Sequence, residues 1–250
     1  MTSVSSQTPA PAGKSANNSY LPPAVPETAT DMSIAKHIDH TLLSPQALEA
    51  DIQNLCREAK AFGFKAVCVA GCHLGAAREL LSGSGVLLAT VVGFPHGNTS
   101  TEAKCCEAAA ALEAGADELD VVLNVGWVKS GRFSRVSAEL ERLRATAPGT
   151  PLKLILETCY LNREEKRRVC QMALEARWDF VKTSTGFGTA GATLADVGLM
   201  KEVVGTAMEI KASGGIRDHE TALQYLRAGA TRIGTSSGPA IVAGENQTKP

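Results

Sequence analysis

Short apolar runs alternate with longer amphipathic segments along most of this chain. Runs rich in Val, Ile, Leu and Ala, bounded by Gly, Pro, Ser or Asn, predict β-strands, and apolar residues at helical spacing predict helices. The predicted strands lie within 34–43, at 65–70, 86–92, 118–124 and 152–157, around Lys182 and Lys211, and at 231–234.

A predicted helix follows each predicted strand. Ser44 as N-cap and Pro45 in the first turn predict a helix that runs to about Lys60 and stops near Gly63. The segment Ala-Gly-Ala occurs twice where a helix should end, which is typical of a glycine just past the last turn. The other predicted helices are 71–81, from Thr99 or Ser100 to Gly115, around 137–145, 163–176, 194–204 and 218–228.

Strands that alternate with helices form parallel sheets, and eight such units in 250 residues predict a closed (β/α)₈ barrel. An open doubly wound sheet is the alternative, but its Gly-x-Gly-x-x-Gly first turn is missing. We expect one catalytic barrel domain over 34–250. Residues 1–33 are rich in Ser, Pro, Ala and Thr and predict a disordered tail, for which no function is indicated.

Composition excludes several classes of protein. A net charge of −1 argues against a nucleic-acid binder, which carries a basic excess. No apolar run is long enough to span a bilayer, and the first residues lack a secretory signal. Seven scattered cysteines indicate reduced thiols and a cytoplasmic protein rather than a disulfide framework. Only 4% of residues are aromatic, so the core must be aliphatic.

Two lysines stand near the ends of consecutive predicted strands, and Ser and Gly follow both. Active sites of such barrels lie at the carboxyl ends of the strands. Neighbouring strands are about 4.8 Å apart, so Lys182 and Lys211 should repel each other. Burial and repulsion lower a lysine pKa, and a neutral amine attacks a carbonyl to form a Schiff base. The spacing does not indicate which lysine is the nucleophile.

A carboxylate and three loops complete the predicted site. Asp120 and Asn124 are four residues apart on one predicted strand and should share a face, so Asp120 suits proton transfer beside the amines. The loops 184–188, 213–216 and 235–238 offer small residues with free N–H groups. Barrels bind phosphate in such loops, so we expect a substrate with a phosphate at one end and a carbonyl-derived carbon at the other.

Four segments, in order and with sensible spacing, resemble the motif set of the deoxyribose-phosphate aldolases, a family of class I aldolases. They are Ile38–Leu43 (IDHTLL), Glu118–Asn124 (ELDVVLN), Phe180–Gly186 (FVKTSTG) and Lys211–Arg217 (KASGGIR). Each motif alone is weak, whereas the ordered set, which spans about 34–238, is highly specific.

The resemblance implies the reversible cleavage of 2-deoxy-D-ribose 5-phosphate to D-glyceraldehyde 3-phosphate and acetaldehyde, without cofactor or metal. It implies that Lys182 forms the Schiff base, that Lys211 perturbs it and relays protons, and that Asp120 is the acid and base. It places Asp39 at a substrate hydroxyl or bridging water and Cys68 in the pocket. The substrate-binding positions, mostly for phosphate, are Thr185, Gly186, Gly214, Gly215, Ser236 and Ser237. A homodimer is a further expectation.

Two departures from the family pattern bear on the strength of phosphate binding and of proton transfer, and not on the type of reaction. Some members have a lysine where this chain has Phe187, and some end in a tyrosine that reaches the site, whereas this chain ends in Pro250. We therefore expect phosphate affinity and proton transfer to differ in strength. The alternatives are a Schiff-base barrel aldolase for another phosphorylated sugar and a non-catalytic sugar-phosphate sensor.

The other polar clusters in the sequence do not predict a metal site or a catalytic site. His37 and His40 around Asp39 lack a third convergent metal ligand, and Cys68, Cys72 and His73 lack a second Cys/His pair for zinc. Lys153 and Glu157 should share one face of the fifth strand as polar filling residues, and we place both outside the site.

Overall fold

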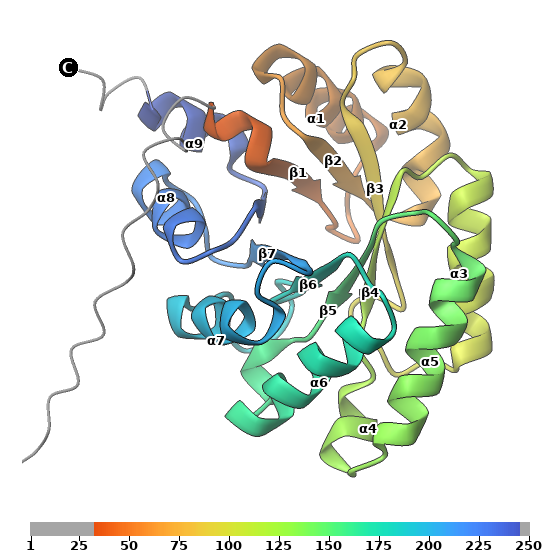
Figure 1. The fold of residues 1–250 in the computed structure, drawn as a ribbon. Coiled ribbons are helices and arrows are strands. Elements are labelled where there is room, and N and C mark those ends of the chain that lie inside the picture. The colour runs from red at the N-terminus through yellow and green to blue at the C-terminus, as the bar shows by residue number, and fades with distance from the viewer. Residues whose placement is uncertain (1–32, 246–250) are drawn as a thin grey trace, which may run out of the picture.

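The computed structural model describes residues 33–245, and its centre is a closed barrel of eight parallel strands in sequential order (Figure 1). The predicted (β/α)₈ barrel is therefore confirmed. The strands are β1 (Ile38–Leu42), β2 (Ala66–Val69), β3 (Leu87–Val92), β4 (Glu118–Val122), β5 (Leu152–Ile155), β6 (Phe180–Lys182), β7 (Glu209–Ser213) and β8 (Arg232–Thr235).

Helices surround the barrel on the outside (Figure 1). They are α1 (Glu49–Phe62), α2 (Leu74–Leu81), α3 (Thr101–Glu113), α4 (Val125–Lys129), α5 (Phe133–Thr146), α6 (Arg163–Glu175), α7 (Leu194–Val204), α8 (His219–Arg227) and α9 (Gly238–Glu245). Short 3₁₀ turns are η2 (Ile34–His37), η3 (Gly71–His73) and η4 (Thr158–Tyr160).

Strand alternation separates an apolar layer from a charged one. Along β4, Leu119 and Val121 belong to the aliphatic core that packs against the helices. Glu118 and Asp120 occupy the alternate positions and point into the barrel, where they pair with cations. The apolar layer supplies the burial that stabilises the fold, and it holds the inner charges in place.

Helix termini match the local signals closely. Ser100 accepts a hydrogen bond from the backbone N–H of Ala103, and Asn162 forms a capping box with Glu165. Gly115 has φ of 90°, as expected where the chain leaves a helix in a left-handed conformation.

Helix α1 begins later than predicted. The hydroxyl of Ser44 accepts a hydrogen bond from the N–H of Gln46 and forms a tight turn instead of a helix cap. The helix starts after Leu48, whose N–H donates to the carboxylate of Asp51 at 2.9 Å. Gly63 ends it at φ of 65°, as predicted.

Asn124 does not extend the fourth strand, so the predicted face shared with Asp120 is wrong. The strand ends at Val122, and Asn124 instead caps α4, where its side chain accepts from the N–H of Trp127. Asparagine favours such caps because its short side chain bonds the exposed helix N–H groups. The small helices α4 and α9 were not predicted either.

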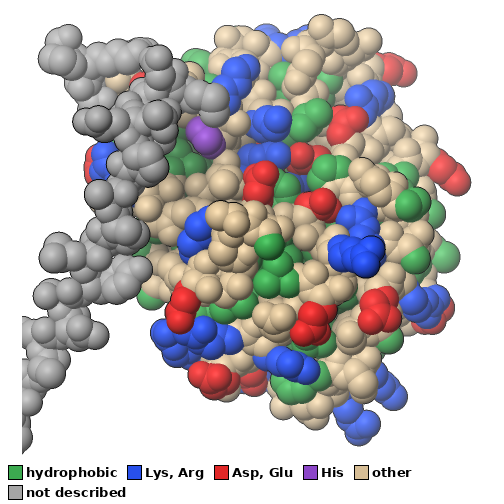
Figure 2. Space-filling model, viewed as in Figure 1, with side chains coloured by type: hydrophobic (Ala, Val, Ile, Leu, Met, Phe, Trp, Pro, Cys, Tyr) green, Lys and Arg blue, Asp and Glu red, His purple; other side chains and the backbone are tan. Residues whose placement is uncertain are grey.

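The predicted disordered tail lies outside the described residues except for Ser33, and its boundary stays a prediction. No helix within residues 33–245 is long and apolar enough to cross a membrane. Lys, Arg, Asp and Glu side chains are mixed over the face shown in Figure 2, in agreement with the near-neutral net charge.

Candidate active site

A cavity of about 450 Å³ opens among the loops that follow the strands β1, β6, β7 and β8. Its two charged lining residues, Lys182 and Arg217, are both cations, and several of the others are glycines or hydroxyl residues. This composition suits an anionic substrate. The lining comprises Thr41, Leu42, Leu43, Ser44, Pro45, Lys182, Thr185, Gly186, Phe187, Ser213, Gly214, Gly215, Ile216, Arg217, Gly234, Thr235 and Ser236.

Asp120 is the centre of a buried charge network beneath this cavity. Its Oδ2 atom accepts hydrogen bonds from the Nζ atoms of Lys182 at 2.7 Å and Lys211 at 2.8 Å. Its Oδ1 atom accepts from Nζ of Lys153 at 2.8 Å. The register explains these contacts, because Asp120 lies beside Lys153 across β4 and β5, and Lys182 lies beside Lys211 across β6 and β7.

Two further carboxylates complete the network. Asp39 on β1 pairs with Lys211 through Oδ2 and with Arg232 through Oδ1, both at 2.5 Å. Glu118 on β4 accepts two hydrogen bonds from Arg232 and forms an ion pair with Lys153 at 2.7 Å. The side chains are nearly or fully buried, so each charge depends on these partners rather than on water.

The network holds one more cationic side chain than carboxylates. Asp39, Glu118 and Asp120 face Lys153, Lys182, Lys211 and Arg232. An unbalanced buried charge is expensive, and the least costly relief is for one lysine to lose its proton.

The pKa values of the two central lysines show which amine loses its proton more readily. Burial lowers the pKa of Lys182, and repulsion from Lys211 adds to that effect, although Asp120 opposes it. Burial also disfavours the charge on Lys211, but Asp120 and Asp39 together outweigh burial and raise its pKa. The two lysines predicted to repel each other are thus separated by the carboxylates, and Lys182 is the more readily neutral.

The carboxylates stay ionised. Burial alone would raise the pKa of Asp39, but Lys211, Arg232 and Lys153 together lower it to about 2. Burial would also raise the pKa of Asp120, but Lys153, Lys182 and Lys211 outweigh burial and hold that pKa well below its usual range. At neutral pH, Asp120 is therefore ionised, and it accepts hydrogen bonds from both Lys182 and Lys211.

Most of the predicted substrate-binding residues meet at the cavity. Thr185, Gly186, Gly214, Gly215 and Ser236 line it. The glycines adopt left-handed backbone conformations, for example φ of 90° at Gly186, which side chains rarely tolerate.

Three predicted substrate-binding residues stand apart from the lining: Asp39, Ser237 and Cys68. Asp39 is fully buried and pairs with Lys211 and Arg232, so its predicted contact with a substrate hydroxyl or a bridging water stays a prediction. The N–H of Ser237 donates to the hydroxyl of Thr235 at 2.9 Å, and Ser237 does not line the cavity. Cys68 is fully buried on β2 beside Ala89 and Val91. Burial raises the pKa of its thiol, so the sulfur stays protonated and packs as a small apolar group.

Three residues of the charge network were missed by the sequence interpretation: Lys153, Glu118 and Arg232. The predicted strand face shared by Lys153 and Glu157 is wrong, because β5 ends at Ile155 and Glu157 has a left-handed backbone. Lys153 was placed outside the site, yet its Nζ atom contacts Asp120. The two-residue spacing of Glu118 and Asp120 in a strand could have indicated that both point inward. No local pattern indicates Glu157, because its role depends on a loop 28 residues later.

The two histidines near Asp39 have separate partners. His37 pairs through Nδ1 with the carbonyl of Thr231 at 2.9 Å, and His40 pairs through Nε2 with Glu58 at 2.8 Å. Among residues 33–245, no group of three or more His, Cys, Asp or Glu side chains is arranged to hold a metal ion.

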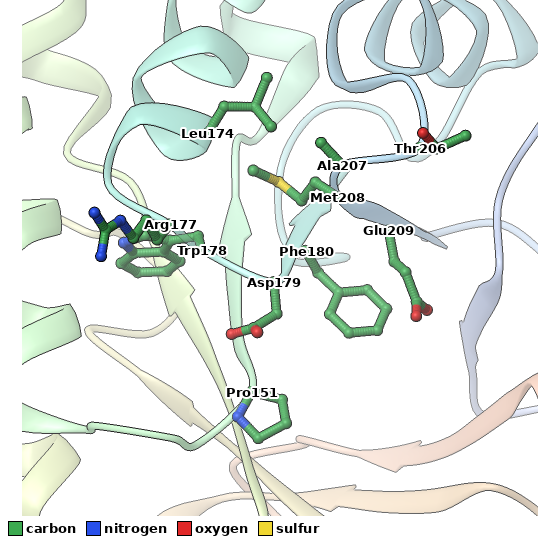
Figure 3. A pocket seen from close by; sticks show the side chains of 10 residues that line it. All are labelled: Pro151, Leu174, Arg177, Trp178, Asp179, Phe180, Thr206, Ala207, Met208 and Glu209. Atoms are coloured by element: carbon green, nitrogen blue, oxygen red, sulfur yellow. The ribbon is translucent and has the colours of Figure 1, made fainter.

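A second cavity, of about 600 Å³, lies at the opposite end of the barrel, among residues that precede β5, β6 and β7 (Figure 3). Its carboxylates already have partners: Asp179 accepts from Arg144 and from the N–H of Leu152, and Glu209 accepts from Thr231. Among the residues that the structure describes, no lysine lines this second cavity, in contrast to the cavity that Lys182 lines.

Comparison with known proteins agrees with this geometry. Residues 33–244 match the DeoC/LacD family of aldolases. The deoxyribose-phosphate aldolase of Thermococcus gammatolerans is 54% identical over 217 residues, which cover 85% of this chain and 96% of that protein. The corresponding enzyme of Carboxydothermus hydrogenoformans is 51% identical over 215 residues, 84% of this chain and 94% of that protein.

A solved structure supports the same assignment. The tetrameric deoxyribose phosphate aldolase of Aeropyrum pernix is 35% identical and superposes with a TM-score of 0.80, over 86% of this chain and 92% of that one. With a match along nearly the whole barrel, this chain belongs to the DeoC/LacD family of aldolases.

Proposed function

We propose that this protein cleaves 2-deoxy-D-ribose 5-phosphate reversibly to D-glyceraldehyde 3-phosphate and acetaldehyde through a Schiff base on Lys182. One observation carries the assignment of the nucleophile. Among the cations of the described network, Lys182 is the one that lines the cavity, and its pKa is lowered. Lys211 is fully buried and does not line the cavity, and its raised pKa makes it the more strongly protonated of the two lysines.

The reaction begins with the neutral amine of Lys182. Its nitrogen lone pair attacks the aldehyde carbon of the open-chain sugar, and the carbonyl oxygen takes a proton to give a carbinolamine. Loss of the hydroxyl as water leaves a protonated imine. Asp120 contacts both lysines at one oxygen, so it can pass protons between Lys182 and Lys211 during these steps.

The protonated imine then accepts the electrons of the breaking bond. The C3 hydroxyl loses its proton, the C2–C3 bond breaks, and its electron pair forms an enamine while D-glyceraldehyde 3-phosphate leaves. Protonation of the enamine carbon regenerates an imine, and water releases acetaldehyde and the free amine.

The far end of the cavity suits the substrate phosphate. Gly186, Gly214 and Gly215 bring backbone N–H groups to the lining, and Arg217 adds a positive charge there. Helix α9 begins at Gly238, directly after the loop of Ser236 and Ser237, and a helix N-terminus favours anions. These groups replace the lysine that some family members carry at the position of Phe187.

Phe187 makes one side of the cavity mouth apolar. Its ring is 52% exposed and lies edge-on to the ring of Phe94, with the centroids 5.3 Å apart. An apolar group here adds no charge to the phosphate end, so we expect weaker phosphate affinity than in members with lysine, and the same reaction.

Borohydride trapping is the test of this proposal. The protein is incubated with acetaldehyde, reduced, and analysed by intact mass and peptide mapping. One ethyl group on Lys182, absent in Lys182→Ala, is the expected result, because the imine is reduced in place. An adduct on Lys211 would exchange the two roles, and a folded protein without any adduct would contradict the Schiff base.

Two alternatives make different predictions for the same preparation. An aldolase for another phosphorylated sugar would cleave that sugar faster when aldoses and ketoses are compared. A sugar-phosphate sensor would bind ligand without turnover, and it would have no use for two lysines on one carboxylate.

Location and assembly also remain proposals. All seven cysteines are unpaired, which supports a reducing compartment such as the cytoplasm. We expect a homodimer in solution, and sedimentation velocity tests it: a purely monomeric protein at micromolar concentration would contradict the expectation.

A further inference from the structure

Glu157 is a buried carboxylate with an unusual backbone. It follows β5, is 4% exposed, and has φ of 52° and ψ of 64°, in the left-handed region that glycine favours. For a residue with a side chain, that conformation is unfavourable and persists only where the surroundings enforce it. Such a position is a candidate for a specific role.

The carboxylate of Glu157 holds the loop that follows Lys182. It accepts hydrogen bonds from the backbone N–H of Thr185, at 3.2 and 3.3 Å to its two oxygens, and from the hydroxyl of Thr185. That hydroxyl in turn accepts from the N–H of Phe187 at 3.0 Å. One side chain thus determines the path of the chain on both sides of Gly186.

The loop also closes tightly over Glu157. A Cβ atom on Gly188 would lie 3.0 Å from the carboxyl carbon of Glu157 and 2.9 Å from Sγ of Cys159. Glycine at position 188 lets the loop approach so closely. We call residues 183–188 the β6 loop.

Backbone hydrogen bonds connect the same two segments nearer to the nucleophile. The N–H of Leu156 donates to the carbonyl of Lys182 at 2.9 Å, and the N–H of Thr158 donates to the carbonyl of Thr183 at 3.0 Å. Beyond Thr183, the hydrogen bonds between the two segments are accepted by the side chain of Glu157 and no longer by backbone carbonyls. The connection therefore runs without a break from Lys182 to the predicted phosphate-binding glycine.

None of the ion pairs among residues 33–245 includes Glu157. Its contacts to the β6 loop are neutral N–H and O–H donors. An anion close to a predicted phosphate site would weaken phosphate binding by charge alone. Glu157 therefore acts on the loop through its hydrogen bonds to Thr185 and not through attraction to the phosphate.

We propose that Glu157 is a positioning residue that holds the β6 loop in the conformation that binds the substrate phosphate, and that it thereby determines the preference for phosphorylated substrates. This inference rests on the proposed function. It assigns Glu157 no contact with the reacting carbons, so the chemistry at Lys182 should survive its loss.

The test compares two substrates in Glu157→Ala and Glu157→Gln. With 2-deoxy-D-ribose 5-phosphate, we expect KM to rise about tenfold or more in Glu157→Ala, because two hydrogen bonds to a charged acceptor are lost. Glu157→Gln keeps one acceptor oxygen and should show a smaller rise. With unphosphorylated 2-deoxy-D-ribose, kcat/KM should stay within about twofold in both. Inorganic phosphate should inhibit both variants less than the wild type.

Glu164→Ala is the matched control, because it removes an exposed carboxylate in α6, and it should leave both substrates unaffected. Equal losses with both substrates, or an unchanged KM for the phosphorylated one, would overturn the proposal. If Glu157→Ala does not fold, Glu157→Gln carries the comparison, since it has the same size. Failure of the proposed function would differ, because the wild type itself would then cleave neither substrate.

Discussion

At the scale of single residues, the proposed chemistry rests on three lysines that share one carboxylate. Asp120 binds Lys153 through one oxygen and Lys182 and Lys211 through the other. Only the lysine that reaches the cavity has to react. The remaining two hold Asp120 as an anion and keep positive charge near Lys182, which favours its neutral form.

Lys211→Leu should slow the enzyme strongly. Repulsion from Lys211 contributes to the lowered pKa of Lys182, so its loss raises that pKa and leaves less neutral amine. Activity requires the neutral amine, hence the acid limb of the kcat/KM profile should move to higher pH. At neutral pH, turnover should fall about a hundredfold or more, since a proton relay is lost as well.

Lys211→Arg, which keeps the charge, is the control for that profile and should leave its acid limb closer to the wild-type position. Near-wild-type turnover in Lys211→Leu would remove Lys211 from the mechanism.

Lys153→Met tests whether the third lysine acts on the reaction from outside the cavity. Without this cation, Asp120 attracts the proton of Lys182 more strongly, so the pKa of Lys182 should rise and the acid limb should again shift upward. Lys153→Arg should preserve the wild-type profile. A loss of activity in Lys153→Met that is equal at every pH would indicate a purely structural role.

At the scale of elements, the cavity depends on loops that approach each other more closely than side chains allow. Gly191, in the loop between β6 and α7, packs on Gly214 in the loop after β7. A Cβ atom at position 191 would lie 2.5 Å from the carbonyl carbon of Gly214 and 3.0 Å from its Cα atom. The N–H of Ala192 also donates to the carbonyls of Ser213 and Gly214.

Gly191→Ala should therefore push the two loops apart. We expect KM for 2-deoxy-D-ribose 5-phosphate to rise about tenfold, because the backbone donors of Gly214 and Gly215 shift. Gly198→Ala is the matched control: this residue lies within α7 and a Cβ atom there would meet nothing within 4 Å. Alanine should stabilise that helix by about 0.5–1 kcal/mol without changing KM. Equal KM values in Gly191→Ala and Gly198→Ala would contradict the explanation that the close contact between the two loops shapes the cavity.

At the scale of the whole molecule, the charged barrel interior links stability to pH. The pKa of Asp39 falls from 3.8 to about 2 on folding, which corresponds to about 2 kcal/mol. Because the folded-state pKa is the lower one, this contribution is complete above about pH 4. It is lost as the pH falls through about 2.

Asp39→Asn should accordingly be less stable than the wild type at pH 7, where Lys211 and Arg232 lose a carboxylate. The difference in the free energy of unfolding, measured in urea, should shrink by about 2 kcal/mol between pH 5 and pH 2, since the wild-type Asp39 is then protonated as well. A difference that stays constant over this range would show that Asp39 does not titrate as described.

The sequence by itself determined the alternation of elements and the identity of the reactive groups. The helix cap at Ser100 and the chain reversal at Gly115 are local features that their residue types predicted, whereas Ser44 forms a turn in place of the predicted cap. The order of strands then fixed Lys182 and Lys211 as neighbours, because parallel strands joined by helices pair in sequence. The resemblance of four motifs identified the family.

The family resemblance already named Lys182 as the nucleophile, and only the tertiary structure shows how its surroundings differ from those of Lys211. Closure of the barrel brings β1, β4, β5 and β8 together, and with them Asp39, Glu118, Lys153 and Arg232, whose charges set the pKa values of the two central lysines. Glu157 meets Thr185 only because two loop backbones converge above the sheet. Coulombic interaction and desolvation depend on distance and burial in three dimensions, and neither quantity can be read from spacing along the chain.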